Sequence, residues 1–119
     1  MTVKELYESF NGNYQNALQT MMNDEFIKRM LSKFLVNNCF QDLVNHYENK
    51  NLRGVFEASH SLKGVAGTLS LTPIYEKAMV VCEKTRFLQE GESIDLDQEV
   101  GELKEAYNLV VTAISKFLN

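Results

Sequence analysis

The sequence has no long apolar run, no paired cysteines and no basic stretch. No segment approaches the roughly 20 apolar residues that a membrane-spanning helix needs, so we expect no direct membrane contact. Cys39 and Cys82 lie far apart and outside any CxxC motif. With no secretory signal segment, this favours a cytoplasmic location and two buried free thiols. A formal net charge of −4 argues against nucleic acid as a partner, because binding to a phosphate backbone needs a basic surface.

Motifs for nucleotide and metal binding are also missing. There is no glycine-rich P-loop, and the two histidines, His46 and His60, are too far apart for an HExxH zinc site. A chain of 119 residues, 45% of them hydrophobic, can bury one core but has no room for a second catalytic domain. We therefore expect one domain over residues 1–119, no enzymatic turnover, no metal and no cofactor of its own.

What the sequence does contain is helical periodicity from end to end. Its single proline, Pro73, marks a sharp boundary, since proline disfavours a helical residue before it but suits the first turn of a following helix. Short connections between long helices imply antiparallel neighbours. The pattern predicts an all-α, antiparallel up-down four-helix bundle over about residues 24–118, with one or two short N-terminal helices that cap one end.

Local signals predict the helix boundaries. At the N-terminus we expect a short helix opened by a capping box at Thr2 and Glu5, and a second one over Tyr14–Met22. A long helix capped by Asp24 follows, with a kink or break at Asn37-Asn38. The remaining expected elements are a helix over Leu52–Leu71, one from Thr72 to Gln89 or Glu90 with Gly91 as its C-terminal cap, and a last helix that starts near Asp95.

The helix predicted around His60 has two distinct faces. At about 100° per residue, an apolar stripe lies opposite His60 and is expected to face the core. This stripe comprises Val55, Ala58, Leu62, Val65, Ala66 and Leu69. The side of His60 carries Arg53, Phe56, Glu57, Lys63, Gly64, Gly67 and Leu71. His60 should therefore project into solvent from a firmly held helix. His46 has no comparable neighbours, and we expect it to have a surface or helix-packing role.

Two glycines accompany His60 on its own side. A glycine inside a helix costs about 1 kcal/mol relative to alanine, so Gly64 and Gly67 call for a compensating role. Both leave room beside the imidazole for another surface to approach. Lys63, one turn from His60, places an ammonium group within reach of an anion on the ring. This combination suits a bulky, doubly charged group such as a phosphoryl.

The string HSLKGVAGTLSL, residues 60–71, resembles the signature of histidine-containing phosphotransfer (HPt) domains: a histidine, an apolar residue, Lys-Gly, a small residue and a further glycine. It is also similar to the phosphate-accepting domain of chemotaxis kinases. Ser70 departs from the pattern, since many relatives have glycine there. The resemblance in helix order extends from about Asn13 to the C-terminus and excludes residues 1–12.

The resemblance implies a phosphorelay carrier. His60, through its Nε2 atom, would accept a phosphoryl group from a receiver aspartate or a kinase and pass it to the receiver domain of a response regulator, while Lys63 would support the charge. The partner would supply Mg²⁺ and the remaining machinery, as positioning and charge neutralisation dominate phosphoryl transfer. The docking surface would consist of an exposed Phe56 at its centre and, around it, Arg53, Glu57, Gly64 and Gly67. A neighbouring helix end that covers Phe56 is an equally open reading.

Two other functions remain open at this stage. The chain could be the phosphate-accepting domain of a chemotaxis-type histidine kinase, or a receiver-binding module that is never phosphorylated. The expected partners are a response-regulator receiver domain and a sensor or hybrid histidine kinase, and the expected state is a monomer.

Overall fold

The computed structural model describes residues 1–119 as seven helices without strands, which confirms the all-helical prediction. The helices are α1 (Val3–Ser9), α2 (Tyr14–Met21), α3 (Asp24–Leu35), α4 (Cys39–Glu48), α5 (Leu52–Thr68), α6 (Thr72–Thr85) and α7 (Asp97–Leu118).

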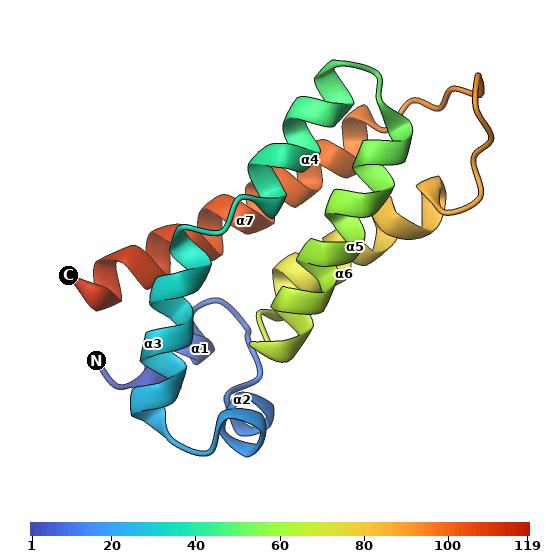
Figure 1. The fold of residues 1–119 in the computed structure, drawn as a ribbon. Helices are drawn as coiled ribbons and strands as arrows, with labels where there is room; N and C mark the ends of the chain where they lie inside the picture. The colour runs from blue at the N-terminus through green and yellow to red at the C-terminus, as the bar shows by residue number, and fades with distance from the viewer.

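The long helices form the expected bundle (Figure 1). The α5 helix packs between α4 and α6, and α7 runs along the other side of α6 and along α3. Helices α3 and α4 together form the first arm of the bundle. Tyr107 of α7 links the last helix to this arm, because its ring stacks on Phe40 of α4 with centroids 3.9 Å apart and also contacts Phe34 of α3. The short helices α1 and α2 lie at one end, near both chain termini (Figure 1).

The first arm of the bundle is broken into two helices. The predicted weak point at Asn37-Asn38 is a true break, in which the Asn37 side chain accepts a hydrogen bond from the Cys39 N–H at 2.8 Å and so helps to start α4. The cap expected at Asp24 was wrong. Asn23 caps α3 by accepting from the Phe26 N–H at 2.8 Å, while Asp24 accepts from the hydroxyl of Tyr14 at 2.7 Å.

The α1 helix and the residue after it pack on the bundle through a buried face of aliphatic and aromatic side chains. Val3, Leu6, Tyr7 and Phe10 are each no more than 2% exposed. The predicted capping box is present, with reciprocal hydrogen bonds between Thr2 and Glu5. The hydroxyl of Tyr7 donates to the Leu69 carbonyl oxygen at 2.7 Å, so α1 is tied directly to the C-terminal end of α5.

The α6 helix is shorter than predicted. It starts at Thr72-Pro73 as expected but ends at Thr85, whose hydroxyl bonds back to the carbonyl oxygens of Val81 and Cys82. Beyond this point Phe87 is 82% exposed. Gly91 is therefore no helix cap and lies instead, with φ of +89°, in the loop over residues 86–96.

The same loop delays the start of α7, which begins at Asp97. Asp95 still helps to start it, accepting from the Asp97 N–H at 2.9 Å. The Tyr47 hydroxyl accepts from the Leu96 N–H at 2.9 Å, which fixes the end of α4 to the start of α7. Both cysteines are free, but the prediction of two buried thiols holds only for Cys82, since Cys39 is half-buried.

Candidate functional site

His60 lies on the exposed face of α5, and the opposite face of that helix is buried. Val55, Leu62 and Ala66 are each at most 1% exposed, whereas His60 is open to solvent. The bundle thus holds the helix from behind and leaves the imidazole accessible to solvent. Leu71, which the periodicity placed on the side of His60, is buried, because α5 ends at Thr68 and Ser70 adopts a left-handed conformation with φ of 57°.

Phe56 lies one turn before His60 and is in direct contact with it. The two rings stack with centroids 5.9 Å apart and planes inclined by 23°. The C-terminal end of α6 partly covers Phe56, as one of the two predictions had it, because the guanidinium group of Arg86 lies over the phenyl ring at 5.5 Å from its centroid. Phe56 is half-buried and offers its remaining surface beside the imidazole.

The charged groups around His60 differ in how they are held. Arg53 donates from Nε to Oε1 of Glu57 at 3.1 Å, and both side chains are largely exposed. Lys63, by contrast, forms no salt bridge within 4.0 Å. No carboxylate therefore engages its ammonium group, which belongs to a residue about one turn from His60.

The two glycines have different surroundings. A Cβ added at Gly64 would meet nothing within 4 Å, so this position leaves open space beside His60. A Cβ at Gly67 would lie 3.3 Å from the ring of Tyr75. Gly67 thus lets α6 pack closely against α5, a role that the sequence did not reveal, and its contact with a partner stays a prediction.

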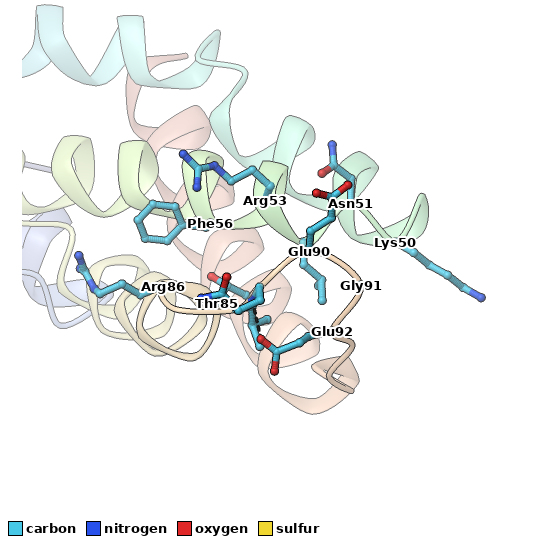
Figure 2. Close-up of a pocket in the computed structure, with 12 residues that line it drawn as sticks. Lys50, Asn51, Arg53, Phe56, Thr85, Arg86, Glu90, Gly91 and Glu92 are labelled. Atoms are coloured by element: carbon cyan, nitrogen blue, oxygen red, sulfur yellow. Dashed lines mark hydrogen bonds between the residues drawn. The ribbon is translucent and has the colours of Figure 1, made fainter.

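Two hollows flank the His60 face. One is a cleft of about 560 Å³ between the start of α5 and the loop after α6. Arg53, Phe56 and Arg86 are among the residues that line it (Figure 2). The other is a groove of about 500 Å³ between α3 and α5. Gly64 and Val65 line this groove from α5, and Met30 and Phe34 line it from α3. The sequence pattern did not reveal either hollow, since the residues of α3 and α6 are distant in the chain.

His46 has a packing role. Its ring lies against Gly54 of α5, so close that an added Cβ there would be 2.5 Å from two ring atoms, and Asn51 Nδ2 lies 3.3 Å from its Nδ1. This agrees with the expected helix-packing function. No group of three or more potential metal-ligating side chains occurs in the structure. No helix is both long and apolar enough to cross a membrane.

Comparison with known protein families gives one match. The model of a family described as "Hpt domain" matches residues 29–113, which include the first arm of the bundle from within α3, all of α5 and α6, and most of α7. No curated protein and no solved structure matches the chain significantly.

Proposed function

Since this chain belongs to the Hpt domain family, whose members take part in histidine phosphotransfer in two-component signalling, we propose that His60 is its phosphoryl-carrying residue. One observation supports this choice above all. His60 is exposed on a helix that is buried from behind, and the turn that follows it carries Gly64, where an added Cβ would have no neighbour within 4 Å. The other histidine, His46, is instead packed against Gly54.

The proposed step is a direct exchange of bonds at phosphorus. The lone pair of Nε2 of His60 attacks the phosphorus of an aspartyl phosphate on a receiver domain. The N–P bond forms as the P–O bond to the aspartate breaks, and the carboxylate leaves with that electron pair. The reverse exchange delivers the group to the aspartate of another receiver. Positioning and charge neutralisation supply most of the catalysis in such transfers.

Within this proposal, Lys63 neutralises charge on the phosphoryl group. Its ammonium group has no carboxylate partner within 4.0 Å in the unphosphorylated chain, so binding a phosphoryl oxygen breaks no existing salt bridge. Mg²⁺ and the acidic residues that bind it belong to the receiver. Hpt domains are phosphocarrier modules rather than enzymes with turnover of their own.

The docking surface in this proposal surrounds His60 on three sides. Phe56, one turn N-terminal to His60, supplies an apolar contact, and Gly64, one turn C-terminal to it, leaves clearance. The groove between α3 and α5 extends the apolar surface beyond Gly64 toward α3. Arg53 and Glu57 form the charged rim, and Gly67 extends the small-residue side. Apolar centres with polar rims are typical of protein interfaces.

We propose a receiver domain and a sensor or hybrid histidine kinase as partners, and a cytoplasmic monomer without contact to membrane or nucleic acid as the working state. The chain would be equally suited to serve as the phosphate-accepting domain of a chemotaxis-type kinase. Donor identity separates these two roles: a relay carrier accepts from a phosphorylated receiver, whereas a kinase substrate domain accepts from a kinase with ATP.

The test offers the purified chain both kinds of donor. Wild type is incubated with phosphorylated receivers and Mg²⁺, and separately with histidine kinases and ATP, and base-stable, acid-labile phosphate is followed. We expect label on wild type and none on His60→Gln at equal thermal stability. Label that persists in His60→Gln would refute the assignment. No label on wild type from any donor, while it still binds receivers, would favour an unphosphorylated binding module.

A further inference from the structure

The C-terminal end of α6 carries a pair of opposite charges beside Phe56, the aromatic neighbour of His60. Arg86 donates to Oε1 of Glu83 from Nε at 3.2 Å and from Nη2 at 2.8 Å. The same guanidinium group lies over the ring of Phe56, 5.5 Å from its centroid, and that ring stacks on His60. Glu83 and Arg86 are thus connected to His60 through a single aromatic side chain.

Glu83 interacts with the cations on both α5 and α6. The hydrogen bond from Arg86 is the main reason why the pKa of its carboxyl group lies below the usual range, and the positive charges of Arg86 and Lys63 lower it further. The Glu83 carboxylate therefore remains ionised near neutral pH, and its negative charge acts on the surface that would receive a phosphoryl group.

The pair is too exposed to be explained by stability. The side chains of Arg86 and Glu83 are 31% and 56% exposed, and exposed ion pairs add little to the free energy of unfolding. The Arg86 side chain also borders the cleft beside Phe56 (Figure 2). A long, flexible side chain at this border is free to turn once its carboxylate partner is replaced.

We propose that Glu83 competes with the phosphoryl group on His60 for Arg86, and so limits how strongly the phosphorylated state is stabilised. This inference rests on the proposed function of His60. In the unphosphorylated chain Arg86 is bound to Glu83. When His60 carries a phosphoryl group, that dianion attracts the guanidinium, which then divides its hydrogen bonds between the two anions.

The consequence is a phosphohistidine that is readily handed on. A carrier has to accept its group and then release it, so excessive stabilisation on His60 would stop the relay at this chain. Glu83 acts as a positioning residue through Arg86, since it holds the Arg86 guanidinium partly away from the phosphoryl group on His60. Neither residue lies on the helix that carries His60, and so neither could be found from the HSLKG string.

The test is a double-mutant cycle on the equilibrium of phosphoryl exchange with one receiver. Wild type, Glu83→Gln, Arg86→Gln and the double variant are each mixed with a labelled receiver and Mg²⁺, at concentrations too low for stable complexes. The ratio of label on the two proteins at equilibrium is measured. Such a ratio depends on the stability of phosphohistidine and not on how fast the partners dock. Glu102→Gln, which removes the remote ion pair with Lys77, is the matched control.

We expect Glu83→Gln to shift the equilibrium toward phosphorylated His60 by about two- to fivefold, in the range that exposed charge pairs support. Arg86→Gln should shift it the other way, Arg86→Lys should restore part of the loss, and 1 M salt should reduce all these shifts. In the Arg86→Gln background, Glu83→Gln should have a clearly smaller effect, because most of its influence passes through Arg86 and only its charge interaction with Lys63 remains. Glu102→Gln should behave as wild type.

An unchanged equilibrium in Glu83→Gln, with wild type still labelled on His60, would overturn this inference and leave the carrier function intact. An equal shift in Glu83→Gln with and without Arg86 would also overturn it, because the effect would then be a general field effect of the lost charge. Absence of label on wild type would overturn both the inference and the proposed function.

Discussion

The ring of Phe56 stacks on the imidazole of His60 at a centroid distance of 5.9 Å. The two residues are one helical turn apart, so the backbone of α5 fixes their spacing. Phe56 is held in turn by the Arg86 guanidinium from α6. Helices α5 and α6 together therefore restrict the orientation of the histidine, and a partner that approaches His60 also meets Phe56.

Replacing Phe56 by alanine should slow phosphoryl transfer about five- to tenfold at limiting partner concentration. The change removes both an apolar docking contact and the ring that stacks on His60, and truncating a central interface residue costs about 1 kcal/mol or more of binding free energy. Quenched transfer reactions with a labelled receiver measure the rate. Phe26→Ala is the control, because Phe26 is also a partly exposed aromatic beside an arginine, on α3. Equal rates in both variants would remove Phe56 from the docking surface.

Gly64→Gln should separate stability from function. Glutamine favours a helix over glycine by roughly 0.5–1 kcal/mol, and an added Cβ meets no neighbour within 4 Å, so the free energy of unfolding should rise. Transfer should nevertheless fall about tenfold or more, because the side chain fills the space that a partner needs. Gly101→Gln on α7, also without neighbours within 4 Å, should gain stability and keep the transfer rate. A fast Gly64→Gln variant would contradict our account of this glycine.

Gly54→Ala should destabilise the fold by about 1–3 kcal/mol, as expected for overpacking. The new methyl group would lie 2.5 Å from the His46 ring and 2.8 Å from Asn51 Nδ2. Asn51 also caps α5 by accepting from the Gly54 N–H at 3.0 Å, so its displacement weakens the start of that helix. Urea unfolding measures the loss. Adding His46→Ala should recover much of it, and a Gly54→Ala protein as stable as wild type would show that this contact is not tight.

Stability should decline in alkaline solution, in part because of Tyr7. Burial raises the pKa of the Tyr7 hydroxyl above its ordinary value. An unfolded tyrosine ionises near pH 10, whereas native Tyr7 keeps its proton, so the unfolded state binds fewer protons above that pH and the free energy of unfolding falls. Tyr7→Phe should cost about 1 kcal/mol at pH 7 through the lost hydrogen bond. Its stability should then fall less between pH 10 and 11, and an unchanged slope would contradict this assignment.

The sequence predicted the long helices well because their apolar positions recur with a helical period and Pro73 marks a sharp start. It predicted the end of α6 poorly. Residues 86–90 continue a pattern compatible with a helix, but α6 ends at Thr85 and Phe87 is 82% exposed. The extent of a helix depends on what it can pack against, which is a property of the whole fold and not of a local pattern.

The same reason limited the prediction of the site. His60, Lys63, Phe56 and Gly64 share one helix, so their relative placement followed from residue spacing. Gly67 and Tyr75 join α5 to α6 by a close contact, and the hydrogen-bonded pair of Glu83 and Arg86 lies at the C-terminal end of α6. Spacing along one helix carries no information about which residues of another helix lie opposite, so these contacts required the structure.

The central claim is that His60 carries a phosphoryl group, and the most direct measurement localises that group. A labelled receiver is mixed with wild type, His60→Gln and His46→Gln in the presence of Mg²⁺, and loss of label from the receiver is followed together with gain on the chain. We predict that wild type and His46→Gln gain acid-labile label and that His60→Gln gains none. Equal labelling of His60→Gln and wild type, or loss of label only in His46→Gln, would contradict the account.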